Sequence, residues 1–153
     1  MDIKSKKQVG GIVGGVLSPY WVAKGSQNRY FGFLDTQYCI PTRQELLDIL
    51  VSNIFTNSIP ARPEVYDCDD YAFHLKASAA TYAVTSKLPA PLLIGLAWAN
   101  FSWVPDEEHV CNWGYTADGG FEWIEPQWVN VPNQNHMRPL NECATASLKC
   151  VLG

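Results

Sequence analysis

The chain has 153 residues, a length that predicts one domain spanning residues 1–153. Hydrophobic residues make up 47% and charged residues 17%, so the chain can build a core and is not intrinsically disordered. The formal net charge is −4, and a small basic cluster of Lys4, Lys6 and Lys7 lies in the N-terminal arm. Because nucleic-acid binding needs a broad basic surface, the composition argues against a nucleic-acid partner.

Membrane and export signals are weak. No apolar run approaches the roughly 20 residues that span a bilayer. The stretch 10–17 follows three lysines but contains four glycines and no clear cleavage site. We therefore expect a soluble, cytoplasmic protein without a membrane partner. Five cysteines, an odd number, fit a reducing compartment with one thiol kept for chemistry, and we expect the other four to be small buried hydrophobic residues: Cys39, Cys111, Cys143 and Cys150.

The first half of the chain predicts two helices after an irregular start. Residues 1–38 are rich in glycine and aromatic residues and predict loops and short strands. A capping box of Thr42 and Glu45 opens the first helix, whose apolar face holds Leu46, Leu47, Ile49, Leu50, Ile54 and Phe55. The second helix is predicted from Cys68 to Val84, because apolar residues recur at helical spacing: Cys68, Ala72, Leu75, Ala79 and Ala83.

The second half predicts strands. Residues 92–98 form an apolar run, and residues 109–115 and 121–125 alternate on either side of a turn at Asp118-Gly119. Further strands are predicted near 128–131 and 146–151. The order of helices followed by sheet predicts an α+β fold.

Cys68 is the residue that most suggests chemistry. A thiol in the first turn of a helix faces unpaired N–H groups and the positive end of the helix dipole, which favour a thiolate. Nearby carboxylates oppose that effect, so Cys68 needs a cationic partner, for which His109 is the candidate. In the predicted hairpin His109 and Glu125 share a face, so Glu125 could orient the imidazole.

These residues resemble the papain-like cysteine peptidase superfamily, including its NlpC and transglutaminase-like members. The resemblance rests on residues 66–73, 109–115 and 121–126, and covers roughly 64–130. It is nearest to the papain-like C-terminal domain of a mushroom agglutinin, which also uses Cys, His and Glu. It implies a papain-like α+β fold, in which an N-terminal helical part and the Cys helix pack on an antiparallel sheet.

The resemblance also implies a cysteine-dependent hydrolase. Cys68, His109 and Glu125 would form its catalytic triad and cleave an amide bond in a peptide or peptidoglycan-type substrate. Arg62 departs from the pattern, because papain-type enzymes place an oxyanion-hole glutamine there. The second donor stays open among Gln27, Gln37, Asn112 and Gln127. The alternative is a catalytically inactive papain-like module that binds peptide or carbohydrate.

No cofactor is required by this chemistry, but calcium is one candidate. Asp69, Asp70 and Gln127 could supply the oxygen ligands that calcium prefers, and the agglutinin resemblance implies calcium activation. The alternative is that the two aspartates only interact with the helix dipole. Acidic residues 106–108 suggest a solvated loop that could select cationic substrates. Most tryptophans of the sheet half are expected in the core, and one or two could stack on a sugar at a cleft edge.

Overall fold

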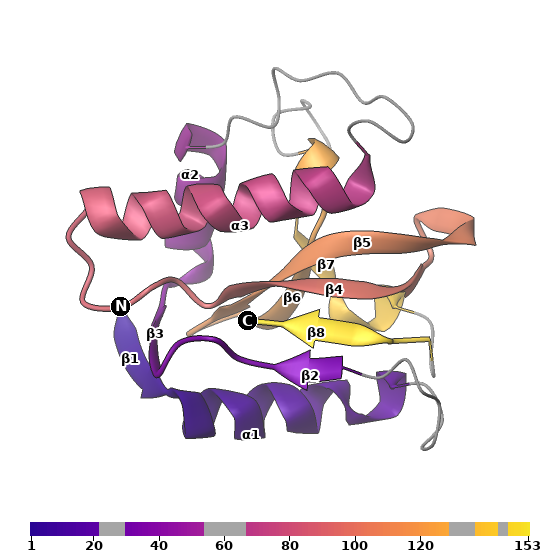
Figure 1. The fold of residues 1–153 in the computed structure, drawn as a ribbon, viewed down its shortest axis with the longest axis horizontal. Helices are drawn as coiled ribbons and strands as arrows, with labels where there is room; N and C mark the ends of the chain where they lie inside the picture. The colour runs from indigo at the N-terminus through magenta and orange to yellow at the C-terminus, as the bar shows by residue number, and fades with distance from the viewer. Residues whose placement is uncertain (22–29, 54–66, 129–136, 144–146) are drawn as a thin grey trace.

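The computed structural model describes residues 1–21, 30–53, 67–128, 137–143 and 147–153, and they form an α+β fold (Figure 1). Its helices are α1 (Lys6–Leu17), α2 (Arg43–Asn53) and α3 (Cys68–Thr85). The six-stranded sheet has the spatial order β2 (Tyr30–Gly32), β8 (Cys150–Leu152), β4 (Ile94–Phe101), β5 (Val104–Thr116), β6 (Gly120–Ile124) and β7 (Met137–Pro139). Its neighbours are antiparallel except for the parallel pair β2 and β8. A separate antiparallel pair joins β1 (Asp2–Ser5) to β3 (Gln37–Ile40).

Helices cover both faces of the sheet (Figure 1). α1 lies on one side, where its stripe of Val9, Val13 and Leu17 packs in a core that also contains Trp113 and Trp123. α3 crosses the other side together with α2, and a second core there includes residues of both helices and of β4 and β6: Leu46, Leu50, Leu75, Ala79, Ile94 and Ile124. Because side chains alternate along the strands, the sheet contributes apolar residues to a core on each of its two faces.

Two glycines of the sheet are needed for close approach or for backbone conformation. A Cβ at Gly95 would lie 2.0 Å from the carbonyl oxygen of Leu152 and 2.4 Å from the Trp113 ring, so only glycine lets β4 and β8 pack at this point. Gly120 has a φ of 75°, in the left-handed region that favours glycine, where the turn re-enters β6.

The predicted helices after residue 40 are confirmed. Thr42 N–H donates to Glu45 Oε2 at 2.8 Å, and Glu45 N–H donates to Thr42 Oγ1 at 3.2 Å, which is the capping box expected before α2. In α3 the predicted apolar positions after Cys68 are all buried. Ile54 and Phe55, predicted for the α2 face, lie outside the described residues.

The strand predictions are partly confirmed. β5 and β6 pair as the expected hairpin, with Asn112 opposite Ile124. β4 begins at Ile94 rather than at residue 92. Trp128 belongs to the short 3-10 helix η3 (Pro126–Trp128) instead of a strand, and 129–131 lie outside the described residues. In the predicted strand 146–151 the described pairing is β8 together with an isolated bridge at Leu148.

The prediction of loops and short strands over residues 1–38 is confirmed for β1 and β2 but is wrong for residues 6–17, which form α1. α1 begins after a capping box, in which the Ser5 side chain accepts the Gln8 N–H and the Gln8 side chain accepts the Ser5 N–H. Four glycines lower helix propensity there by up to about 1 kcal/mol each. Burial of the three-residue apolar stripe offsets that loss, because Val9, Val13 and Leu17 are fully buried at a spacing of four residues.

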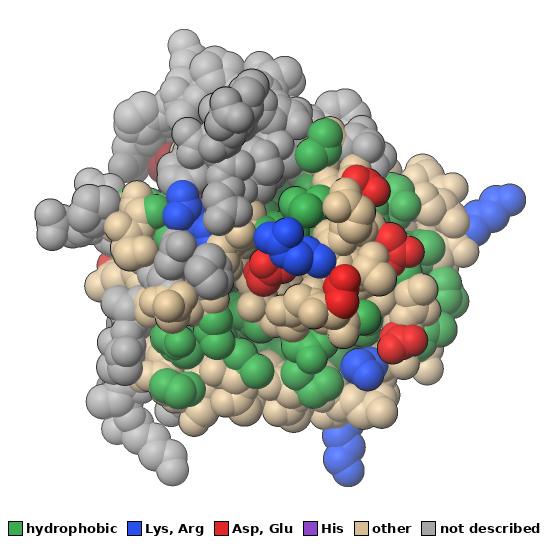
Figure 2. All heavy atoms as spheres, turned by 180° about the vertical axis from the view of Figure 1, so that it is seen from behind, with side chains coloured by type: hydrophobic (Ala, Val, Ile, Leu, Met, Phe, Trp, Pro, Cys, Tyr) green, Lys and Arg blue, Asp and Glu red, His purple; other side chains and the backbone are tan. Residues whose placement is uncertain are grey.

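The surface of the described residues carries mixed charge. On the face seen from behind, acidic and basic side chains are interspersed between hydrophobic ones (Figure 2). In the described part of the chain, no helix combines the length and the apolar character that crossing a membrane requires.

Candidate functional site

Cys68 is the first residue of α3 and is half-buried. The preceding Asp67 has extended backbone, with φ of −120°, and its carbonyl accepts the N–H of Tyr71 at 3.1 Å to start the helix. The Asp67 N–H donates to Asp70 Oδ2 at 3.3 Å. The helix therefore begins directly at the cysteine, and the thiol lies beside the N–H groups of the first turn.

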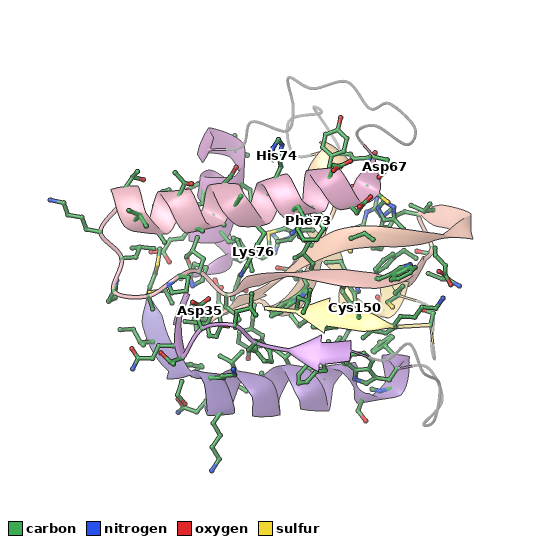
Figure 3. All side chains as sticks on the ribbon, in the orientation of Figure 1. Asp35, Asp67, Phe73, His74, Lys76 and Cys150 are labelled. Atoms are coloured by element: carbon green, nitrogen blue, oxygen red, sulfur yellow. The ribbon has the colours of Figure 1, made fainter. Side chains whose placement is uncertain are left out.

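Polar contacts hold α3 on the sheet. Asn112 of β5 donates from Nδ2 to the carbonyl of Ala72 at 2.9 Å and to that of Gly95 at 3.0 Å. Lys76 donates from Nζ to the Ile94 carbonyl at 2.5 Å and points toward the sheet, whereas His74 points away from it (Figure 3). Burial lowers the pKa of Lys76, and the charge of Asp35 opposes that effect. These contacts fix the position of the Cys68 end of the helix.

His109 and Glu125 meet beyond the paired part of the hairpin. His109 Nε2 lies 2.6 Å from Glu125 Oε2, and both side chains are buried, with 7% and 1% exposure. Glu125 follows β6 by one residue, and the register places it one diagonal step from His109 on the same face. Trp103 Nε1–H also donates to Oε2 at 3.2 Å, and the Gln127 N–H donates to Oε1 at 3.1 Å. The carboxylate is thus held by donors on both oxygens.

The environment of His109 keeps its ring charged at neutral pH. Burial alone would lower the pKa of His109, but hydrogen bonds with the Cys68 and Glu125 side chains and the charge of Glu125 raise it to about 9. One ring nitrogen is used by Glu125, which leaves the other for Cys68. The structure thus brings together the three residues predicted as catalytic, and it places a thiol, an imidazolium and a carboxylate in one chain of contacts.

Trp103 and Asn112 are site residues whose roles sequence reasoning missed. Trp103 orients Glu125, although a tryptophan in the sheet half predicts only core packing. Asn112 was a candidate oxyanion donor, but both of its N–H groups are used by backbone carbonyls. No local pattern signals either role, because their partners lie 17 to 40 residues away in the chain.

Two of the remaining candidates for an oxyanion donor, Gln37 and Gln127, lie in the described part of the chain. Gln37 lies on β3, opposite Ser5, and is exposed. Gln127 is in η3, and its backbone N–H is used by Glu125. Gln27 and Arg62 lie outside the described residues.

The acidic residues around Cys68 are arranged differently from the predicted calcium site. Asp70 accepts the Asp67 N–H, whereas ligand atoms of Asp67, Cys68 and Asp69 all lie within 4.8 Å of one another. A hydrogen bond with the Asp67 side chain, followed by burial, raises the pKa of Asp69. Two carboxylates that share a proton in this way could also share a cation.

A pocket of about 450 Å³ opens between the start of α3 and the sheet, and we name it the α3 pocket. Trp98 of β4 is 43% exposed, and Phe73 of α3 is 57% exposed. Glu108, which belongs to β5 rather than to a loop, forms an ion pair with Lys149, whose Nζ lies 5.2 Å from the centre of the Trp98 ring. The pocket is lined by Cys68, Asp69, Phe73, Leu96, Ala97, Trp98, Glu108, Val110, Cys150 and Leu152.

The cysteines other than Cys68 divide into two groups. Cys39, Cys111 and Cys143 are buried, as predicted, and burial raises the pKa of the Cys111 and Cys143 thiols, that of Cys143 to about 11. Cys150 differs from the prediction, because it is only half-buried and lines the α3 pocket.

No protein-family model matches the chain, and no curated protein matches it. Solved structures do. One, described as a PSL1a–E64 complex, has a TM-score of 0.72 and 20% identity, over 99% of this chain and 51% of that chain. Another is Polyporus squamosus lectin bound to the human-type influenza-binding epitope Neu5Aca2-6Galb1-4GlcNAc, with a TM-score of 0.65 and 18% identity, over 99% of this chain and 49% of that chain. The chain therefore spans about half the length of these structures, and the likeness shows the fold.

These structures correct several predictions. The identification as a papain-like cysteine peptidase is not supported, because one structure is described as a lectin and neither as a peptidase. The predicted amide hydrolase activity is corrected on the same finding. The predicted peptide or peptidoglycan-type partner is also corrected, because the molecule bound to the lectin is a carbohydrate epitope.

Proposed function

We propose that this protein is a carbohydrate-binding module and that the α3 pocket is its sugar site. The observation that carries the proposal is the half-exposed ring of Trp98 beside the carboxylates of Asp69 and Glu108. An aromatic ring packs against the apolar C–H face of a sugar, and carboxylates accept hydrogen bonds from its hydroxyl groups. A pocket of about 450 Å³ is within the usual size range for a small-ligand site.

The likeness to a lectin supports this function without locating the sugar site. The glycan named for Polyporus squamosus lectin is bound by a chain about twice as long as this one. Its matched half is related to this chain in fold at 18% identity, which leaves the pocket residues free to differ. The case for the α3 pocket therefore rests on its own aromatic and acidic residues.

The test is glycan binding by isothermal titration and on a glycan array, with Trp98→Ala as the diagnostic variant. Loss of a stacking surface worth about 1.4 kcal/mol should weaken binding about tenfold. Phe31→Ala is the matched control, because Phe31 is also an exposed aromatic residue, at 40%, but it packs edge-on against Trp21 and Phe33 on the α1 side. Absence of glycan binding, or equal binding by Trp98→Ala, would contradict the proposal.

We also propose that Cys68, His109 and Glu125 act together as one reactive-thiol centre, of which Cys68 lines this pocket. Support comes from the hydrogen bond between His109 and Glu125 and from the raised pKa of the imidazole. An imidazolium next to a thiol favours its thiolate form, which is the nucleophilic one.

The proposal also includes the domain organisation, the backbone arrangement and one bound ion. We infer one domain over residues 1–153 and a papain-like arrangement of its backbone, supported by α3 lying across β4 and β5. No cofactor is required for sugar binding. We propose that Asp69 and Asp67 bind calcium as an optional ion, because their carboxylates lie close together. In this proposal Asp67 replaces Asp70 and Gln127, the other two residues of the predicted calcium site.

A further inference from the structure

The α3 pocket is more apolar than the stacking of one sugar ring requires. Its far wall is built from Leu96 of β4, Val110 of β5 and Leu152 of β8, three side chains that face α3 from neighbouring strands. Phe73 closes the helix side (Figure 3). A sugar ring, which carries a hydroxyl on most of its carbons, would leave these walls without a matching apolar surface.

The charged side chains that line the pocket are both acidic. Among the described residues that line it, the ionisable oxygens belong to Asp69 and Glu108, and none of the lining residues is a Lys, Arg or His. Glu108 is already paired with Lys149. The side chain of Asp67 adds a further carboxylate next to Asp69, because their ligand oxygens lie within 4.8 Å of each other. In calcium-free buffer, a ligand with its own carboxylate would therefore meet carboxylates in the pocket lining, while the nearby Lys149 is already paired with Glu108.

We infer that the α3 pocket holds the apolar aglycone of an uncharged glycoside and discriminates against acidic ligands. This inference rests on the proposed function and deepens it. The sugar stacks on the exposed Trp98 at the mouth, while the aglycone reaches the wall of Leu96, Val110 and Leu152. An acidic sugar such as the sialic acid bound to the fungal lectin is then a poor ligand for this site.

The experiment is a chain-length series of N-acetyllactosamine glycosides. Methyl, butyl and hexyl glycosides are titrated calorimetrically in the presence of chelator, with a 5-carboxypentyl glycoside as the charged analogue of the hexyl compound. Each CH₂ placed on the apolar wall should tighten binding about fourfold until the pocket is full. The terminal carboxylate should weaken binding about fivefold or more relative to the hexyl compound.

Labelling of the two thiols that line the pocket shows whether the glycoside binds there. Cys68 and Cys150 line the pocket, whereas Cys39 is buried elsewhere, so the hexyl glycoside should slow iodoacetamide labelling of the first two only. Val110→Thr keeps the branched shape but replaces one methyl group with a hydroxyl, which should at least halve the gain per CH₂. Val84→Thr, at an exposed position near the far end of α3, is the matched control. Should Val110→Thr fail to fold, Leu152→Thr replaces it.

The outcomes separate the inference from the proposed function. An affinity independent of chain length, or equal binding of the carboxypentyl and hexyl compounds, overturns the inference while leaving sugar binding intact. The converse outcome is that 1-hexanol protects both thiols while no glycoside binds better than hexanol itself. That result supports an apolar-ligand pocket and overturns the carbohydrate function.

Discussion

Glu125 Oε2 lies 2.6 Å from His109 Nε2, and this pair is almost wholly shielded from solvent. A buried ion pair is tolerated only where further hydrogen bonds satisfy its atoms. Here the Trp103 indole N–H and the Gln127 backbone N–H supply them. The pair is therefore a fixed element of the fold, and its charge state should be visible in stability as well as in the reactivity of Cys68.

Protein stability should depend on pH through His109. Its pKa of about 9 in the folded protein exceeds the ordinary value of 6.5, so the folded state binds the proton more tightly. The resulting stabilisation is complete below about pH 6.5 and is lost as pH rises through about 9, with up to about 3 kcal/mol at stake. Urea unfolding between pH 6 and 10 measures it as the difference from His109→Gln. Parallel curves for the two proteins would contradict the assignment.

Glu125→Gln should lower the pKa of His109 toward its ordinary value, because the amide keeps the shape but removes the negative charge. It should also cost about 1–3 kcal/mol in the free energy of unfolding. The imidazole proton signals of His109, followed by NMR against pH, report the first effect. Glu122→Gln is the matched control, because Glu122 lies on β6 and its carboxylate pairs with Arg43 instead of His109. This control variant should leave the pKa of His109 unchanged.

Asn112→Ala should loosen the start of α3. The substitution leaves the carbonyls of Ala72 and Gly95 without their side-chain donor, at a cost of about 2–3 kcal/mol. Hydrogen exchange of the amides in the first two turns of α3 should accelerate more than exchange in β5. Asn100→Ala, at an exposed position on β4, should stay within about 0.5 kcal/mol of wild type. Uniform acceleration across the sheet would show that Asn112 stabilises the whole domain instead of the helix.

Local signals explain the part of the structure that the sequence predicts. The box of Thr42 and Glu45 and the hairpin turn before Gly120 each depend on residues a few positions apart, so a short window contains the information. The shared face of His109 and Glu125 follows from strand alternation, which also works at short range. The geometry of the site was predictable to that extent.

The remaining features depend on contacts that no short window contains. α1 forms in spite of its glycines because Val9, Val13 and Leu17 are buried against the sheet, an interaction with distant strands. The roles of Trp103 and Asn112 depend on which elements come together in space. Function was harder still, because the same thiol and imidazole can occur in an enzyme or in a binding protein, and the site alone does not separate these classes.

Cys68 should be the fastest thiol to react with iodoacetamide at pH 7. Cys39 and Cys111 are fully buried, and burial raises the pKa of the Cys150 thiol, so each should react more slowly. His109→Gln removes the cationic neighbour and should slow Cys68 about tenfold while leaving Cys150 unchanged. Peptide mass spectrometry after timed labelling measures both rates in one sample. Equal slowing of the two thiols would point to a general change of the pocket.

Calcium should stabilise the fold through Asp69. With its pKa raised by the hydrogen bond with Asp67, this carboxylate carries unfavourable charge at neutral pH, which a divalent ion would neutralise. Calcium at about ten times its dissociation constant would add about 1.4 kcal/mol, a rise in melting temperature of about 3–6 °C.

Asp69→Asn separates this effect from a general response to salt. The amide mimics the protonated acid, so the variant should melt slightly above wild type in chelator and should not respond to calcium. Asp2→Asn, an exposed change on β1, should keep the wild-type response. Magnesium at the same ionic strength is the ion control, because it demands a stricter octahedral geometry than two neighbouring carboxylates provide. If wild type melts at one temperature in calcium, magnesium and chelator, the aspartates act only on the start of α3.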